Sequence, residues 1–151
     1  MRVHTLERSQ VLPRPPAEVG AFFADPANLE RLTPPWLHFR VATPLPLALR
    51  RGTLIDYRIR LHGVPLSWRS LISAWDPPRG FIDEQVRGPY SLWIHEHVFE
   101  PAPGGTRVRD RVRYAVPGGA LVRRLLVAPD LERIFDHRAG RAAELLGAPR
   151  A

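Results

Sequence analysis

Hydrophobic and polar residues alternate with a period of two along the middle of the chain, which is typical of half-buried β-strands. In the last such stretch, Val108 and Tyr114 share one side, while the odd-numbered positions from 107 to 113 are all arginines. Turns rich in glycine or proline separate the stretches and join them into a meander of hairpins. The predicted strands of this meander are residues 52–61, 64–75, 81–87, 91–100 and 106–116.

Helical patterns precede and follow the meander in the sequence. Pro16 opens a short helix and Asp25 caps a second, because proline fits the first helical turn and an aspartate side chain satisfies free amide groups there. Near the C-terminus, hydrophobic residues recur at helical spacing after Pro129, where we expect a kink or a restart. The predicted elements outside the meander are strands at 2–13 and 36–43, two short helices between them, and helices at 120–127 and 131–146.

This order of elements predicts an α+β fold in one domain spanning residues 1–151. A long antiparallel meander with one solvated face must bury its other face. The C-terminal helix is the only predicted element long enough to fill a curved sheet. A chain of 151 residues with 44% hydrophobic content can bury a core of that size.

Two of the predicted strands turn polar side chains toward the interior. Side chains alternate along a strand, so Asp83 shares a face with Phe81, and His95 and His97 share a face with Trp93. Large aromatic residues mark that face as buried, and buried polar groups cost free energy unless something satisfies them. Either these groups satisfy one another, or they line a hollow that holds a ligand.

The two ends of the chain carry a recognisable pattern. It consists of a strand, a proline, a short helix and an Asp-Pro step, and of a long finishing helix that contains Ile134 and Phe135. The opening residues of the pattern are Val11, Pro13, Pro16, Val19, Phe22, Asp25, Pro26, Asn28 and Leu29. In these features the sequence resembles the START-like superfamily of helix-grip proteins, also called SRPBCC, which includes polyketide cyclases, lipid-transfer START domains and the major birch pollen allergen.

The resemblance extends over nearly the whole chain. It implies a seven-stranded antiparallel sheet wrapped around the C-terminal helix, with an apolar tunnel between them. The residues that would then line the pocket are Tyr57, Trp68, Phe81, Asp83, Gln85, Trp93, His95, His97, Phe99, Asp110, Tyr114 and Phe135, with Arg138 among the helix residues that could close it. An apolar lining with a few convergent polar groups is the usual makeup of a small-molecule site. We therefore expect a lipid, quinone or polyketide-like ligand.

Catalysis is the first alternative. A cyclase or dehydratase could use His95 or His97 as a base, with Asp83 or Asp110 orienting it, because histidine titrates near neutral pH. The His-x-His spacing is also found in metal-binding cupins, but their next carboxylate ligand comes after three or four intervening residues. Glu100 follows after only two, so the sequence predicts neither a metal nor a cofactor.

Charge supplies the second alternative, an interaction module. The net charge is +7, and the arginines at positions 107 to 113 would offer an acidic protein or a nucleic acid a docking surface. All 22 basic residues are arginine, however, and they are scattered along the chain, which a GC-rich bacterial genome explains without an anionic partner. We expect that row to face water and to pair with Glu84, Glu96 or Glu100 across strands.

The location we expect is the cytoplasm. The sequence has no cysteine, its first residues form no apolar signal core, and no hydrophobic run approaches the roughly 20 residues of a membrane-spanning helix.

Overall fold

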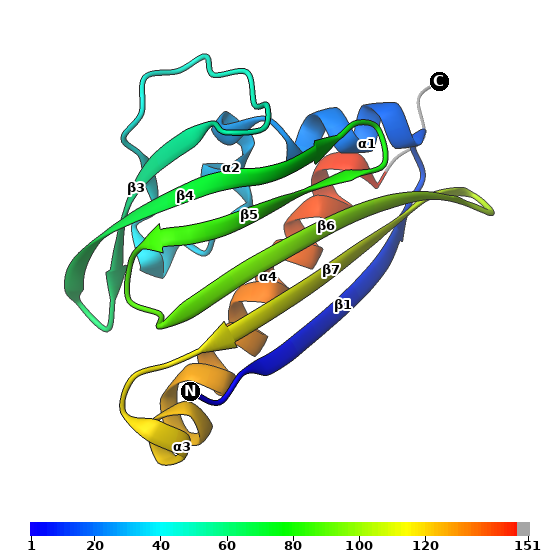
Figure 1. The fold of residues 1–151 in the computed structure, drawn as a ribbon. Helices are drawn as coiled ribbons and strands as arrows, with labels where there is room; N and C mark the ends of the chain where they lie inside the picture. Colours follow the sequence, from blue (N-terminus) through cyan, green and yellow to red (C-terminus); the bar gives the residue numbers. More distant parts are fainter. Residues whose placement is uncertain (148–151) are drawn as a thin grey trace.

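A long helix lies across the inner face of a curved antiparallel sheet in the computed structural model, which describes residues 1–147 (Figure 1). The strands are β1 (His4–Leu12), β2 (Arg40–Val41), β3 (Leu54–Leu61), β4 (Val64–Asp76), β5 (Gly80–Arg87), β6 (Leu92–Ala102) and β7 (Gly105–Ala115). The helices are α1 (Pro16–Phe23), α2 (Pro26–Leu32), the 3₁₀ turn η1 (Pro35–Leu37), α3 (Gly119–Val122), the π-helical turn η2 (Arg123–Val127) and α4 (Ala128–Leu146).

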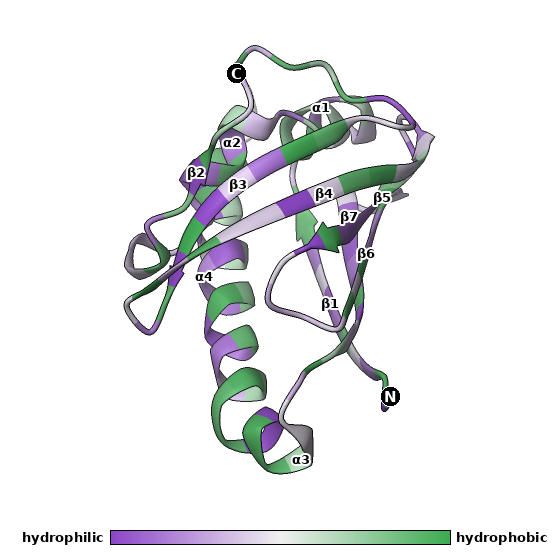
Figure 2. Ribbon diagram, turned by 60° about the vertical axis from the view of Figure 1, so that its left-hand side comes forward, coloured by the Kyte–Doolittle hydropathy of each residue, from purple (hydrophilic) through white to green (hydrophobic). Residues whose placement is uncertain are grey.

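The seven strands follow the order β1-β7-β6-β5-β4-β3-β2, and every neighbouring pair is antiparallel. The expected helix-grip arrangement is therefore confirmed. β1 closes one edge because it returns beside β7 (Figure 1). Helix α1 packs against β6 and β7, and α2 packs against β2 and α4. Hydrophobic and polar residues alternate along β3 and β4, so one face of each strand turns toward the helix (Figure 2).

Two hydrophobic clusters fill the space between sheet and helices. The larger one joins α1, α2 and the end of α4 to the inner face of the sheet, with Val19, Leu32 and Ile55 almost completely buried. The smaller one packs Leu131 and Phe135 of α4 against β6 and β7. The two clusters hold the helix on the sheet along its whole length, because both draw residues from α4.

The interior face of β4 is set partly by a β-bulge. Ile72 stands opposite Asp83 and Ala74 stands opposite Ile82, so the intervening Ser73 has no partner on β5. A bulge residue shifts the alternation by one position. As a result Trp75 lies on the same side as Phe81, and the centroids of their rings are 5.8 Å apart.

The predicted strand at residues 36–43 is mostly wrong. Only Arg40–Val41 pairs with β3, and Pro35–Leu37 forms a single 3₁₀ turn. Proline has no amide hydrogen to donate to a sheet, and His38 adopts a left-handed conformation with φ 47°, so the chain cannot run straight here. The turn instead buries Leu37 and leaves Trp36 half-exposed against His137.

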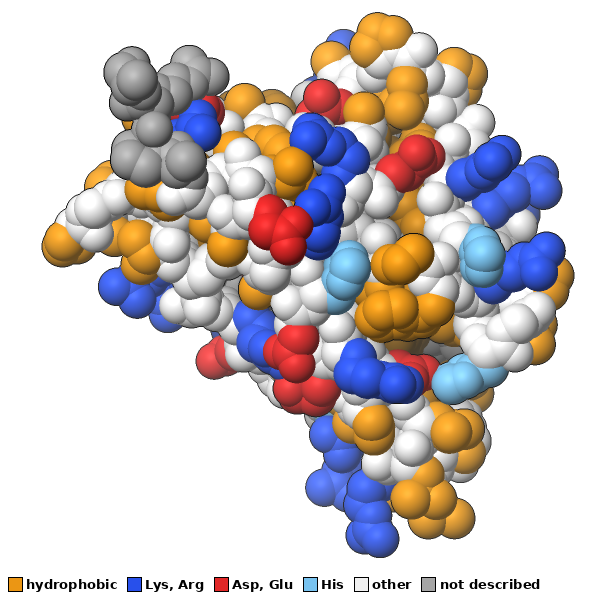
Figure 3. Space-filling view, turned by 180° about the vertical axis from the view of Figure 1, so that it is seen from behind, with side chains coloured by type: hydrophobic (Ala, Val, Ile, Leu, Met, Phe, Trp, Pro, Cys, Tyr) orange, Lys and Arg blue, Asp and Glu red, His pale blue; other side chains and the backbone are white. Residues whose placement is uncertain are grey.

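The C-terminal helix is longer than predicted, because it continues without a break through Pro129. A proline ring collides with the carbonyl four residues earlier in an α-helix, and the wider π-helical turn η2 removes that conflict. At the same end of the molecule, Leu121, Leu125 and Leu126 are exposed beside arginines of η2. Seen from behind, hydrophobic and basic side chains gather at the lower tip of the molecule (Figure 3).

Gly80 allows β5 to approach the backbone of β6 closely, because it has no side chain. A Cβ atom at this position would lie 2.0 Å from the carbonyl oxygen of His97. Gly140 lies on α4 with open space around it. We expect Gly80→Ala to lower the free energy of unfolding by about 2 kcal/mol or more, and Gly140→Ala to raise it by roughly 0.5–1 kcal/mol. Urea denaturation measures both changes, and equal values for the two variants would contradict the close approach.

Candidate functional site

Four ionisable side chains meet at the centre of the sheet on three adjacent strands. β5 provides Asp83, β6 provides His95 and His97, and β7 provides Asp110. In the register of the strands, Asp83 lies opposite His95 and Asp110 lies opposite His97. All four belong to the inner face predicted from the alternation, and we call them the His–Asp cluster.

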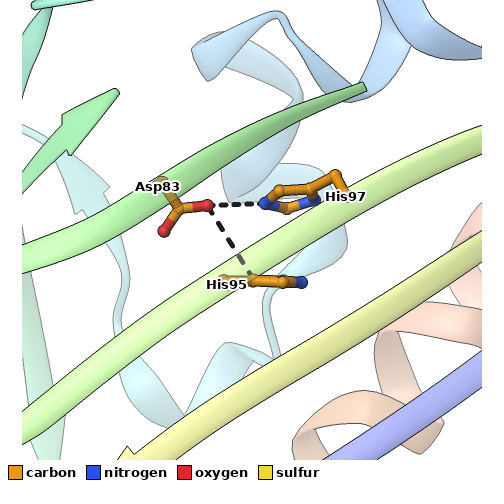
Figure 4. A group of neighbouring side chains, drawn as sticks. All are labelled: Asp83, His95 and His97. Atoms are coloured by element: carbon orange, nitrogen blue, oxygen red, sulfur yellow. Dashed lines mark hydrogen bonds and ion pairs between the residues drawn. The ribbon is translucent and has the colours of Figure 1, made fainter. Parts of the chain in front are cut away.

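Hydrogen bonds in the cluster run diagonally across the register. Nε2 of His95 lies 2.7 Å from Oδ1 of Asp110, and Nε2 of His97 lies 2.5 Å from Oδ2 of Asp83. The other nitrogen of each ring faces the other carboxylate, with Nδ1 of His95 3.9 Å from Asp83 and Nδ1 of His97 3.7 Å from Asp110. The two imidazole rings are stacked with centroids 3.7 Å apart, and Asp83 reaches toward both of them (Figure 4).

Aromatic side chains enclose the cluster. The ring of Phe81 stacks on His97 at a centroid distance of 4.2 Å. Trp93 meets His95 edge-on, and Phe135 of α4 lies 5.6 Å from the same imidazole. Both histidines are about 5% exposed or less, so water does not solvate their charged forms.

This environment keeps His97 neutral and both aspartates ionised at pH 7. Burial, together with the neighbouring His95, lowers the pKa of His97 to about 4 against the opposing attraction of the two carboxylates, so His97 is neutral at pH 7. Burial works to raise the pKa of the Asp83 and Asp110 carboxyl groups, but hydrogen bonds from the histidines and attraction to Arg138 outweigh it. Both pKa values therefore lie below the usual range, and both groups are carboxylates.

Arg138 of α4 brings a positive charge to the edge of the cluster. Its guanidinium carbon lies 5.2 Å from the ring centroid of Phe23, above the ring face. Within residues 1–147, the buried Nε and Nη2 atoms of Arg138 have no hydrogen-bond partner. Buried donors are nearly always paired, so two unpaired donor nitrogens on a residue that lines a cavity indicate a missing acceptor.

A cavity of about 180 Å³ lies between the His–Asp cluster and α4. Three aromatic rings in mutual contact, those of Trp68, Tyr90 and Trp93, form one wall. Leu29, Leu32 and Leu37 close it from α2 and η1. Of the residues predicted to line a pocket, those that line this inner cavity are Tyr57, Trp68, Asp83, Trp93, His95, His97 and Phe135.

The other predicted pocket residues lie elsewhere. The amide of Gln85 bridges the β5–β6 turn, donating to the carbonyl of Tyr90 and accepting from its N–H group. The hydroxyl of Tyr114 accepts a hydrogen bond from Arg123, and Asp110 lies behind the histidines, away from the cavity. Phe81 and Phe99 line a second, outer cavity.

The outer cavity, of about 680 Å³, lies between α1 and the turn that joins β4 to β5. Its walls are apolar, and Asp25 is the one charged residue among the described residues that line it. Phe81 separates it from the His–Asp cluster, because its ring faces His97. The outer cavity is thus larger but has almost no polar groups, whereas the polar groups of the site line the inner cavity.

Several lining residues of the inner cavity were not singled out from the sequence. Tyr90 follows a turn, and its ring folds back between Trp93 and Trp68 because Gln85 holds its backbone. Ser70 accepts a hydrogen bond from the indole of Trp68 and is almost completely buried. Only the alternation of β4 pointed to Ser70, and no sequence signal marked Tyr90, Leu37 or Phe39.

The outer face of the sheet carries the arginines of β7. Arg109 pairs with Glu100 at 3.3 Å, as expected. Arg111 pairs with Glu7 of β1 at 3.5 Å rather than with a residue of β6. These pairs are largely exposed, so each contributes little to stability.

Comparison with protein families adds the decisive observation. Residues 3–147 match the family described as polyketide cyclase / dehydrase and lipid transport. The chain belongs to this family. The match covers the whole meander and the C-terminal helix, so the resemblance inferred from the two ends of the sequence is confirmed.

Solved structures share the family's fold at low sequence identity. The protein CV1439 from Chromobacterium violaceum is 16% identical, with a TM-score of 0.76 over 95% of this chain and 97% of that one. The protein TTHA0849 from Thermus thermophilus is 22% identical, with a TM-score of 0.63 over 94% and 99%. The major latex-like protein 151 from Panax ginseng is 9% identical, with a TM-score of 0.71 over 95% and 97%.

No curated protein matches the sequence. No helix within residues 1–147 has both the length and the apolar character needed to cross a lipid bilayer.

His97 makes stability depend on pH in a defined window. Its pKa is about 4 in the folded protein and about 6.5 when the chain unfolds, so unfolding takes up a proton between these values. The contribution of His97 to the free energy of unfolding is therefore largest above pH 6.5, and it decreases as the pH is lowered toward 4. We expect the free energy of unfolding to decrease by about 2 kcal/mol between pH 7 and pH 4.5, as measured by urea denaturation.

The matched variants are His97→Gln and His62→Gln. The first removes the titrating group but keeps a donor for Asp83, so its stability should vary less over this range. The second changes an exposed histidine paired with Asp130 and should keep the wild-type slope. A slope in H97Q as steep as in the wild type would assign the effect to another group.

Proposed function

We propose that the protein binds a compact aromatic molecule that carries a hydrogen-bond-accepting oxygen, in the cavity between the sheet and α4. The observation that carries this proposal is that two donor nitrogens of Arg138 have no partner within residues 1–147, while Arg138 itself lines a cavity walled by aromatic rings. Such a lining favours planar apolar molecules, and a few polar groups fix the orientation of the bound molecule. Membership of a cyclase and lipid-transport family is consistent with a ligand of this kind.

The size of the cavity restricts the ligand. A cavity of roughly 150 Å³ accommodates benzene. The inner cavity of about 180 Å³ therefore suits a single ring with a small substituent. An extended acyl chain needs more space, so among lipids, quinones and polyketide-like compounds we favour a small ring with a carbonyl or phenolic oxygen.

The charge of the site points to a neutral oxygen rather than an anion. Asp83 and Asp110 are both carboxylates, so the cluster already holds two negative charges. These two carboxylates would repel an anionic ligand in a medium of low dielectric constant. A carbonyl oxygen accepts from Arg138 without adding charge.

The same arrangement favours binding over proton-transfer catalysis. A general base needs a nitrogen within hydrogen-bond distance of the substrate. Every ring nitrogen of His95 and His97 instead faces a carboxylate oxygen within 3.9 Å. The cyclase or dehydratase reaction considered from the sequence is therefore less well supported than binding.

Two ligands of similar size test this proposal. Acetophenone has a carbonyl oxygen, and ethylbenzene does not. Arg138→Met removes the donors but keeps a flexible apolar side chain, so we expect it to weaken acetophenone binding by about tenfold to hundredfold, the value of a charge-assisted hydrogen bond. Ethylbenzene affinity should change by no more than about twofold. Tryptophan fluorescence or calorimetric titration gives the four dissociation constants.

Arg133→Met is the matched control, because Arg133 lies on the same helix with an exposed side chain. It should leave both affinities unchanged. Equal losses for the two ligands in R138M would show a packing effect, and no saturable binding of either ligand would refute the proposal.

A further inference from the structure

When both imidazoles are neutral and each donates through Nε2, the His–Asp cluster contains two lone pairs that face acceptors. A neutral imidazole has one N–H group and one lone pair. When Nε2 of His95 donates to Asp110 and Nε2 of His97 donates to Asp83, both Nδ1 atoms keep their lone pairs. These atoms face carboxylate oxygens at 3.9 and 3.7 Å. Such contacts are unfavourable unless a positive charge lies between the two atoms.

Arg138 does not supply that charge by direct contact. Its buried Nε and Nη2 atoms donate to no described residue, including Asp83 and Asp110. With both imidazoles neutral, the cluster therefore has acceptors in excess of donors at the centre of the sheet. A bound cation satisfies such a set, because imidazole nitrogens and carboxylate oxygens are the usual ligands of divalent metals.

We propose that Asp83, His95 and His97 form a binding site for a divalent transition-metal ion. Oδ2 of Asp83, Nδ1 of His95 and Nε2 of His97 are the atoms on the Asp83 side of the stacked rings (Figure 4). The ligand atoms of these three residues lie within 4.8 Å of one another. Ligands on one ion stand roughly 3–3.5 Å apart when metal–ligand bonds are about 2.1 Å. Binding therefore requires the three ligand atoms to move closer together and the stacked imidazole rings to turn until both lone pairs point at one ion.

Asp110 acts as the outer carboxylate of this site. Metal-binding histidines almost always donate their second N–H group to a carboxylate or carbonyl. Nε2 of His95 is already 2.7 Å from Asp110, and Nδ1 of His97 lies 3.7 Å from the same oxygen atom. Binding thus requires the proton of His97 to move from Nε2 to Nδ1, where Asp110 receives it as a hydrogen bond.

The open side of the site faces the inner cavity. Asp83, His95 and His97 line that cavity, whereas Asp110 lies behind them. Three protein ligands then leave one or more coordination positions directed at the space where a small molecule fits. Two nitrogens and one oxygen suit Zn²⁺, Co²⁺ or Fe²⁺ rather than Mg²⁺ or Ca²⁺.

Cobalt and zinc titrations of the untagged full-length protein test this site. Co²⁺ in a site of this kind should give visible absorption bands that saturate at one ion per chain, with an affinity in the micromolar range or tighter. Zn²⁺ should displace it. We expect Asp83→Asn and His95→Gln to weaken binding by about hundredfold or more, and Asp110→Asn by about tenfold to hundredfold.

His62→Gln is the matched control, because His62 also pairs with an aspartate, Asp130, but on the surface. It should leave the affinity unchanged. Histidine ring signals in the NMR spectrum of the wild-type protein give a second readout that needs no variant: Zn²⁺ should shift two buried histidines together. Absence of saturable binding, or a site that is lost in H62Q but kept in D83N, would overturn the proposal.

This proposal can fail independently of ligand binding. The acetophenone and ethylbenzene titrations depend on Arg138, which contributes no metal ligand. A protein that binds Co²⁺ but no aromatic ketone supports the metal site alone, and the opposite result supports the cavity alone.

Discussion

The antiparallel register of β5, β6 and β7 is the constraint on which the site depends. It places one acid, two imidazoles and a second acid on the same face of three neighbouring strands, where α4 covers them. Side chains that are two residues apart on a strand, or diagonal across a pair, are close enough to bond. A shift of one residue in any of these pairs would turn the histidines to the opposite face and separate them from their carboxylates.

Burying these groups is costly, and the surrounding structure offsets that cost. Each Nε2 atom of the two histidines has a carboxylate partner, and the rings are held by stacking on Phe81 and on each other. The hydrogen bonds keep both carboxyl groups ionised in spite of burial. What the network leaves unsatisfied is informative, because Arg138 lines the inner cavity and its Nε and Nη2 atoms have no hydrogen-bond partner within residues 1–147.

Much of the site was predictable because alternation in a strand is a local property. Trp93, His95 and His97 face inward for the same reason that Val108 and Tyr114 do. The proline and aspartate signals placed α1 and α2 correctly, since Asp25 does cap α2 through the N–H group of Ala27. The strand predicted at 36–43 was wrong because the two prolines and the left-handed His38 outweigh a short hydrophobic pattern.

The sequence by itself determined the order of the long elements, the inward face of each long strand up to the bulge in β4, and the family. These follow from short-range periodicity, turn chemistry and end signals, which act over a few residues. Only the tertiary structure decided which polar groups meet. The bulge at Ser73, the diagonal bonding of the histidines, the use of Gln85 to brace a turn and the unpaired guanidinium of Arg138 all arise from contacts between segments far apart in the chain. Such contacts depend on how the sheet curves around α4, and no local pattern encodes that curvature.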